Sequence, residues 1–125
     1  MVYSEYDSKD KKTPTSPRPA ATVILVRPFH SRLQVYLLKR SGKSRFFPGT
    51  YVFPGGALDN DDMDPGFWRS HIDMDMEDIS RCFGGAGMTT EDVLGYCVAG
   101  IRETFEEAGV LLAGSRSGLP SEPIY

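Results

Sequence analysis

The sequence predicts a single α/β domain, with short strands in the first half of the chain and one long helix in the second. Its 125 residues are the length of one ordinary domain. Between residues 20 and 58, short β-branched and aromatic runs alternate with proline and glycine, as strands alternate with turns. Residues 90–108 instead repeat apolar side chains at helical spacing and are followed by Gly109, a residue type common at helix ends.

The first two strands are predicted to form a hairpin. Residues 20–27 are apolar and β-branched, which fits a buried strand, and Pro28 would end its ladder because proline lacks a backbone N–H. Residues 33–39 carry a second apolar run after a polar turn, so we expect them to pair with the first. Residues 1–19 are rich in lysine and proline without periodicity, and are predicted to be a disordered arm.

A loop and a third strand are expected next. Residues 41–49 are basic and contain glycine, which indicates a loop. Residues 50–53 fit a short strand that runs directly into Pro54-Gly55-Gly56. At the other end of the chain, residues 113–125 are dominated by Gly, Ser and Pro and are predicted to be an unstructured tail.

Two short helices are predicted before the long one. Asp64 and Pro65 resemble a helix N-cap and a first helical residue. Residues 76–83 form the second short helix, which the glycines after it would stop. We interpret the aromatic side chains of Phe67 and Trp68 as core for this region of the chain.

Three glutamates share one face of the long helix. Glu103, Glu106 and Glu107 are spaced i, i+3 and i+4, so their like charges repel one another. Arg102 is placed to pair with Glu106, which leaves two carboxylates without a counter-charge. Oxygen ligands without His or Cys favour Mg²⁺ or Mn²⁺ as that counter-charge, and a solvated acidic face is the alternative. The opposite face would dock the helix through Leu94, Cys97, Val98, Ile101, Phe105 and Ala108.

The distribution of charge and cysteine limits the functional classes. Residues 20–58 hold six basic and no acidic residues, whereas residues 59–92 hold ten acids and two arginines. This split indicates either clustering on a solvated surface or a basic rim facing an acidic, metal-holding wall. The net charge of −3 argues against a nucleic-acid partner. Two cysteines are too few for a disulfide framework, so we predict a reducing, intracellular location.

Membrane insertion and export are not expected from the sequence. The longest apolar run, residues 20–26, is far shorter than the roughly 20 residues that a membrane span needs. The first residues carry an acid where a secretory signal would carry positive charge, and no apolar stretch follows them. We therefore predict a protein without a signal peptide or a transmembrane segment.

Two segments resemble the two ends of the Nudix box. They are residues 53–56, Phe-Pro-Gly-Gly, and residues 102–110, Arg-Glu-Thr-Phe-Glu-Glu-Ala-Gly-Val. In that family a glycine-bearing loop precedes a helix with the pattern Arg-Glu, two residues, Glu-Glu, one residue, Gly and an aliphatic residue. The resemblance covers residues 20–112. It implies a Nudix α/β/α sandwich with a mixed sheet, and hydrolysis of a diphosphate bond in a nucleoside diphosphate linked to another group.

The resemblance also implies a role for each matched residue. Glu106 and Glu107 would bind Mg²⁺ or Mn²⁺, and Glu103 would bind metal or take a proton from the attacking water. The carbonyl of Gly55 would be a backbone ligand of the metal. Arg102 would hold the carboxylates in place, which makes it part of the predicted catalytic group with Glu103 and Glu106.

The box is interrupted in this chain. Gly56 and Arg102 are 46 positions apart, whereas the common box has far fewer residues between them, including one further Glu. We interpret residues 57–89 as an insertion. Counting back along the helix places the missing Glu at Leu94, and Thr104 stands where the family prefers an aliphatic residue. The carboxylate is then either absent or supplied by another acid: Asp59, Glu91 or Asp92.

A split box is similar to that of the peroxisomal coenzyme A diphosphatases. Residues 37–41, 47–49 and 52–59 resemble the sequence that leads into the box of that subgroup. The resemblance implies that coenzyme A or an acyl-CoA is cleaved to 3′,5′-ADP and 4′-phosphopantetheine or its acyl form. Lys39 and Arg40 are candidates for phosphate contacts, or are charges that face solvent. No peroxisomal address such as Ser-Lys-Leu stands at the end of this sequence. The predicted location is intracellular, either cytoplasmic or peroxisomal.

Two other functions stay open at this point. A Nudix hydrolase of ADP-ribose, NADH or another dinucleotide would keep the chemistry and change the substrate. A truncated or inactive Nudix-like binding module is the second alternative, because only fifteen residues follow Val110 and the fold is expected to be cut short there. An unpaired sheet edge would then favour pairing with another chain, including a homodimer.

Overall fold

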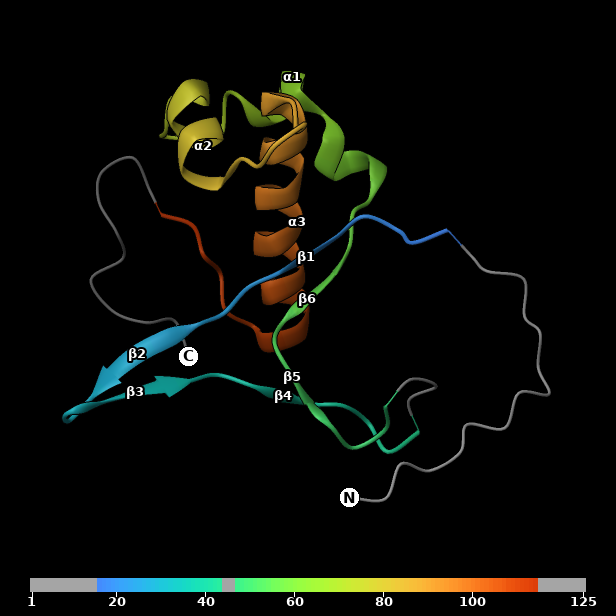
Figure 1. The fold of residues 1–125 in the computed structure, drawn as a ribbon, viewed down its shortest axis with the longest axis vertical. Coiled ribbons are helices and arrows are strands. Elements are labelled where there is room, and N and C mark those ends of the chain that lie inside the picture. The colour runs from blue at the N-terminus through green and yellow to red at the C-terminus, as the bar shows by residue number, and fades with distance from the viewer. Residues whose placement is uncertain (1–15, 44–46, 115–125) are drawn as a thin grey trace.

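The long helix α3 (Thr90–Ala108) is the element around which the others pack, and it begins and ends at the predicted residues. The structure is a computed structural model that describes residues 16–43 and 47–114. Figure 1 shows α1 and α2 beside the N-terminal half of α3, with β1 and β6 crossing the helix further along. The predicted arm (residues 1–19) and tail (residues 113–125) lie mostly outside the described residues.

The strands of the described residues form three antiparallel, two-stranded ladders. Strand β1 (Ala20–Thr22) pairs with β6 (Gly55–Ala57), and β2 (Val26–Phe29) pairs with β3 (Arg32–Val35). The third ladder joins β4 (Leu38–Lys39) to β5 (Tyr51–Val52). Together with the helices, these ladders confirm the α/β class, although the described strands pair as separate ladders and not as one mixed sheet.

The hairpin differs from its prediction in two ways. The run of residues 20–27 is divided between β1 and β2, and only β2 belongs to the hairpin. Pro28 does not end the strand but lies within β2, opposite Leu33. A strand with an open edge tolerates proline, because an N–H that points away from the partner strand has no ladder bond to lose.

The prediction that the first strand is buried is wrong. Val26 and Val35 face each other across the hairpin with exposed fractions of 57% and 48%, and Leu33 is 71% exposed. Among the described elements, the hairpin strands pack mainly on each other and not on a helix. A second correction concerns Gly55 and Gly56, which the Nudix resemblance places in a loop but which form strand β6.

The insertion forms the core together with α3. It contains the short 3₁₀ helix η1 (Asn60–Met63), α1 (Pro65–Trp68) and α2 (Met76–Phe83), and both α1 and α2 lie where they were predicted. The buried cluster consists of Ile79, Val93, Leu94 and Val98, against which Trp68, Ile72, Met76 and Cys97 pack. The core therefore lies between α2 and the first half of α3.

The aromatic residues of the insertion have different environments. Trp68 packs against the core cluster as predicted, but Phe67 is 51% exposed, which corrects its interpretation as core. Phe67 stacks instead on the ring of His71, with 4.2 Å between ring centres.

In the described ranges, no helix is both long enough and apolar enough to pass through a bilayer.

Candidate active site

Caps at both ends fix the length of α3 and place its glutamates in the last turns. The Thr89 hydroxyl accepts a hydrogen bond from the Asp92 N–H (3.1 Å), and the Asp92 carboxylate accepts one from the Thr89 N–H (3.0 Å). Hydrogen bonding from Thr89 lowers the pKa of Asp92. At the other end, Gly109 has a left-handed φ of 68° and donates its N–H to the carbonyl of Phe105 (2.9 Å). The helix thus ends at Ala108, one residue after Glu107.

The glutamate face of α3 is only partly open to solvent. The Glu103 side chain is 15% exposed because it lies against Gly56 of β6. A Cβ added to Gly56 would overlap the Glu103 carboxylate, so glycine makes this approach possible. Glu106 is 57% exposed and Glu107 is also exposed. The helix therefore packs one glutamate against the glycine pair and presents the next two to solvent.

Gly55, the first glycine of the pair, contacts Glu107, the last of the three glutamates. The Gly55 N–H donates to Glu107 Oε2 at 3.0 Å. Gly55 has a φ of 152°, and an added Cβ would collide with the carbonyl of Ala21 in the neighbouring strand. Both observations mean that this position requires glycine. The structure thus brings Gly55 and Glu107 together through the Gly55 N–H, while the predicted role of the Gly55 carbonyl as a metal ligand stays a prediction.

The buried side of α3 differs from the predicted apolar face at two positions. Phe105 is 53% exposed, whereas Thr104 is fully buried. The Thr104 hydroxyl donates to the carbonyl of Gly100 (2.7 Å), which satisfies this polar group inside the fold. Gly100 also lets β1 and the residues after it come close, since an added Cβ would lie 3.1 Å from Val23 Cγ2.

Arg102 ties α3 to two other elements. Its guanidinium donates from Nε to Asp62 Oδ1 (3.0 Å) and from Nη2 to Asp62 Oδ2 (2.8 Å). It also donates from Nη2 to the Ala57 carbonyl of β6 (3.1 Å) and from Nη1 to Glu103 Oε1 (2.9 Å). The pair with Glu106 exists but is longer, at 3.5 Å. A planar guanidinium that binds one carboxylate through two nitrogens fixes direction as well as charge.

Asp62 is the site residue that the sequence analysis missed. Its side chain is 1% exposed, and Oδ2 also accepts the Asp59 N–H at 2.8 Å. The search for a further carboxylate counted back from Arg102, which led through the insertion to Leu94, a buried core residue. Counting forward from Gly56 would have led to the acidic run of residues 59–64.

Of the three acids predicted to supply the further carboxylate, only Asp59 lies near Arg102. Asp59 reaches Arg102 Nη2 only at 3.8 Å, with 66% of its side chain exposed. Glu91 pairs with Arg69 at 2.7 Å, and Asp92 caps the helix. At 1.5 Å rise per residue, Glu91 and Asp92 are roughly 18 and 17 Å along the helix from Glu103. The structure therefore gives Asp62, and not these residues, the close contact with Arg102.

The contact between Asp62 and Arg102 shifts the pKa of both groups in the direction that favours their charged forms. Hydrogen bonding from Arg102 lowers the pKa of the Asp62 carboxyl, more than burial raises it. The same contact with Asp62 raises the pKa of the Arg102 guanidinium. Both groups therefore stay ionised near neutral pH, as a buried charge requires a hydrogen-bonded partner.

The two residues predicted to bind phosphate lie on a different ladder. Lys39 ends β4, and its Nζ lies 6.0 Å from the centre of the Tyr51 ring. The Arg40 N–H donates to the Thr50 carbonyl (2.9 Å), and its side chain is exposed. Strand β4 packs on β5, whereas α3 packs on β1, β6 and the insertion. The structure does not bring Lys39 and Arg40 against the glutamates, and their role stays a prediction.

The carboxylate oxygens of the three glutamates on α3 are of the type that binds divalent cations. Within residues 16–43 and 47–114, no three His, Cys, Asp or Glu side chains converge closely enough to form a metal cluster. Glu103 turns to Arg102 and Glu107 turns to Gly55. Glu106 and Glu107 follow Glu103 by three and four residues, the spacing at which side chains of a helix are neighbours. Carboxylate oxygens without nitrogen or sulfur suit Mg²⁺ or Mn²⁺.

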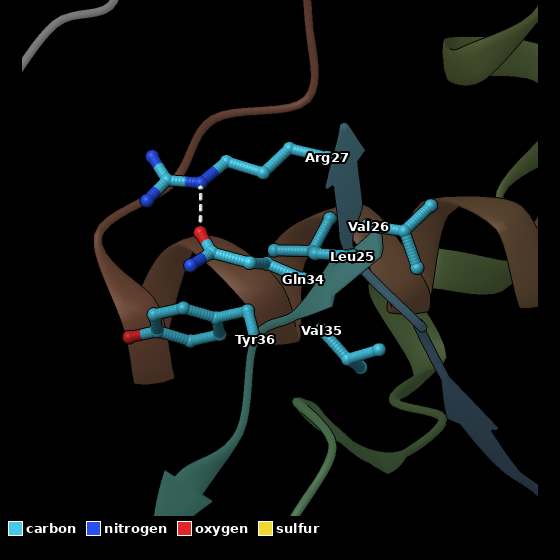
Figure 2. A pocket seen from close by; sticks show the side chains of 6 residues that line it. All are labelled: Leu25, Val26, Arg27, Gln34, Val35 and Tyr36. Carbon is cyan, nitrogen blue, oxygen red and sulfur yellow. Dashed lines mark hydrogen bonds between the residues drawn. The ribbon is translucent and has the colours of Figure 1, made fainter. Parts of the chain in front are cut away.

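Two hollows lie outside this cluster of side chains. One, of about 660 Å³, belongs to the hairpin region and is shown in Figure 2, where Arg27 Nε donates to Gln34 Oε1 (2.8 Å). Its lining consists of Leu25, Val26, Arg27, Gln34, Val35 and Tyr36. The other, of about 800 Å³, is mostly apolar and lies between residues 21–24, α2 and α3. None of the predicted site residues lines either hollow.

Comparison with known proteins relates this chain to Nudix proteins. The chain is 33% identical over 98 residues to the acyl-coenzyme A diphosphatase NUDT19 of Xenopus laevis, a match that covers 66% of this chain and 26% of that protein. It also matches the crystal structure of a NUDIX hydrolase from Alicyclobacillus acidocaldarius, with a TM-score of 0.60 and 30% identity, over 89% of this chain and 46% of that one.

The chain thus spans about a quarter of the curated relative and under half of the solved structure. A family model described as the NUDT19 Nudix domain matches residues 17–122, which include both halves of the interrupted motif and the insertion between them. The chain belongs to the NUDT19 Nudix domain family.

Proposed function

We propose that this protein hydrolyses the diphosphate bond of coenzyme A or an acyl-CoA, in a reaction that depends on Mg²⁺ or Mn²⁺. The products would be 3′,5′-ADP and 4′-phosphopantetheine or its acyl form. The contact of the glycine pair with Glu103 and Glu107 carries the proposal, because it sets the carboxylates of one helix beside the backbone of strand β6. The acyl-CoA substrate class is supported by the description of the Xenopus laevis relative.

Each residue of the cluster has a separate task in this proposal. Glu106 and Glu107 hold the cation, and Glu103 either joins them or takes the proton from the attacking water. A half-buried position against Gly56 suits a base, because burial limits the number of directions in which the carboxylate can point. Arg102 keeps Glu103 in that direction and neutralises part of the negative charge of the cluster.

A bound divalent cation would supply counter-charge to the phosphates and lower the pKa of water. The remaining negative charge of a diphosphate needs cations from the protein. Lys39 and Arg40 are our candidates for this contact, as part of the basic stretch of residues 20–58, which has no acidic residue. We include an intracellular location, cytoplasmic or peroxisomal, in the proposal, since Cys82 and Cys97 are both free thiols.

The proposal is tested by product analysis. The chain is incubated with Mg²⁺ and coenzyme A or an acyl-CoA, and mass spectrometry is used to find 4′-phosphopantetheine and 3′,5′-ADP. A parallel panel of ADP-ribose, NADH and diadenosine polyphosphates covers the other Nudix substrates. Faster turnover of a panel member than of any CoA compound would move the proposal to a dinucleotide hydrolase.

A binding module is tested with the same sample. Isothermal titration with Mg²⁺ and with Mn²⁺ measures metal affinity independently of turnover. Absence of turnover on every substrate, together with absence of metal binding, would support a non-catalytic Nudix-like module. Metal binding without turnover would retain the glutamate cluster as a metal site and reject the hydrolase.

A further inference from the structure

One hydrogen bond connects the insertion to the Arg102 pair. Trp68 is the single tryptophan of the chain, and its ring packs against the core cluster between α2 and α3. Its indole Nε1–H donates to the carbonyl of Asp61 at 2.7 Å. An indole N–H is a donor only, so this contact has one direction and one partner. The core of the insertion therefore holds a specific backbone atom of η1.

That backbone atom belongs to the peptide group that leads into Asp62. The Asp61 carbonyl and the Asp62 N–H share one rigid plane, because the peptide bond has partial double-bond character. The Asp62 N–H donates to the Asp59 carbonyl (3.2 Å), which closes the first turn of η1. Fixing the Asp61 carbonyl thus fixes where the Asp62 side chain starts, and Asp62 then accepts two hydrogen bonds from Arg102.

Gly95 lets η1 lie directly on α3 at this point. A Cβ added to Gly95 would overlap Met63 Sδ and would lie 3.4 Å from the carbonyl oxygen of Asp62. Gly95 is buried in the first half of α3, on the side that η1 covers. Thus η1 packs directly on the surface of α3 at Gly95, and the indole of Trp68 binds the Asp61 carbonyl of η1.

We propose that Trp68 is a positioning residue of the active site, which holds Asp62 on Arg102 through the Asp61 peptide and so orients Glu103. The catalytic consequence rests on the proposed function, whereas the geometric part concerns Arg102 alone. The insertion would then help to position the residues of the motif that it interrupts. Neither Trp68 nor Asp61 belongs to the two halves of the motif.

The test removes the indole N–H and measures the Arg102 pair directly. In Trp68→Phe the ring stays aromatic but the donor is lost. Hydrogen exchange of the Arg102 Nε–H is followed by ¹⁵N NMR, with the signal assigned by its loss in Arg102→Lys. We expect exchange to accelerate about fivefold, the factor that corresponds to about 1 kcal/mol for one hydrogen bond. We expect kcat to fall by up to the same factor, with KM within twofold of the parent value.

Arg69→Ala is the matched control. Arg69 also joins the insertion to α3 by a 2.7 Å hydrogen bond, to Glu91, but among the described residues its side chain forms no hydrogen bond or ion pair with η1 or Arg102. We expect this variant to leave the Arg102 exchange rate and kcat unchanged. Equal acceleration in both variants would overturn the proposal, because a general loosening of the insertion would then explain the effect.

A second replacement covers the case in which Trp68→Phe does not fold. Because the chain has one tryptophan, Trp68 alone is replaced by 3-benzothienylalanine, which keeps the bicyclic shape and lacks the N–H. Unchanged Arg102 exchange in this protein would reject the positioning role. The exchange measurement needs no substrate, so it decides the proposal even if the parent protein proves to have no hydrolase activity.

Discussion

Asp62 accepts two hydrogen bonds from Arg102, at 3.0 and 2.8 Å, although the two residues are 40 positions apart in the chain. Asp62 belongs to η1 of the insertion, and Arg102 begins the second half of the motif on α3. This contact brings the interrupted halves together without continuity of the chain. It also gives Arg102 a partner that is buried, in contrast to the exposed carboxylate of Glu106.

Loss of Arg102 should destabilise the fold more than loss of an exposed arginine. In Arg102→Gln the Asp62 charge stays buried without its counter-charge, and we expect the free energy of unfolding to fall by about 3 kcal/mol. Arg69→Gln breaks a pair whose side chains are 54% and 46% exposed, so we expect a loss of at most about 1 kcal/mol. Urea unfolding followed by Trp68 fluorescence measures both. Equal losses would mean that the Asp62 pair is not buried in solution.

The Asp62 pair should make stability depend on pH in the acid range. The pKa of Asp62 in the folded protein lies below the ordinary value of 3.8. The contribution of ionised Asp62 to the free energy of unfolding is therefore present above pH 3.8 and is lost as the pH falls through the lower, folded pKa. Asp62→Asn removes this titration. We expect the urea midpoint of the parent protein to fall more steeply than that of Asp62→Asn between pH 5 and pH 2. Parallel curves for the two proteins would argue against a depressed pKa.

Glu106→Gln should reduce activity while the fold stays intact. The side chain is 57% exposed and its ion pair with Arg102 is long, so its removal costs little stability. A neutral amide is a weaker metal ligand, and we expect kcat/KM to fall by more than about tenfold. Glu77→Gln, an exposed acid on α2, is the control with the same chemical change. A lost circular dichroism signal in Glu106→Gln would contradict the expected independence of folding.

The two adjacent glycines should respond differently to alanine. Gly56→Ala places a methyl group on the Glu103 carboxylate, the end of a flexible side chain, so we expect lost turnover in a folded protein. Gly55→Ala meets the Ala21 carbonyl of β1 and a φ of 152°, so we expect unfolding at lower urea concentration. Gly42→Ala, which has open space around it, should change neither property. Identical behaviour of the first two variants would reject this division of roles.

The two thiols should react at different rates. Burial raises the pKa of the Cys97 thiol, which packs against the core, whereas Cys82 is exposed. Because the thiolate is the reactive form, we expect Cys82 to react with a disulfide reagent in the native protein and Cys97 only after unfolding. Single Cys82→Ser and Cys97→Ser variants assign the two phases. A fast phase that persists in Cys82→Ser would show that the core opens readily.

The helices could be predicted because their signals are local. Thr89, Gly109 and the acid-proline pair at Asp64 mark helix ends by the hydrogen bonds of their own neighbours. The strands depended on contacts distant in sequence. Nothing local indicates that residues 20–22 leave the hairpin to pair with Gly55 and Gly56, since that pairing is decided by the docking of β6 on α3.

The candidate site also has a part that local sequence patterns predict and a part that depends on distant contacts. The spacing of the glutamates and their approach to the glycine pair follow from one helix and one motif, and both can be recognised in the sequence. Asp62 could not be predicted as a site residue, because an acidic run of several residues offers no local reason to prefer one member. Burial selects it: of the acids near Arg102, Asp62 has the least exposed side chain. Thr104 was not part of the predicted apolar face because it is polar, yet it is buried, since its hydroxyl finds a partner within its own helix.

The contact between η1 and Arg102 divides the insertion into a part of fixed length and a part of free length. From Gly56 to Asp62 the backbone must pass from β6 to the guanidinium, so adding or deleting a residue there would rotate the acid away from it. The glycine-containing link of residues 84–87 between α2 and α3 spans no such contact and should accept extra residues. Related chains that divide this motif are thus expected to vary in length after α2 and to keep the count before Asp62 constant.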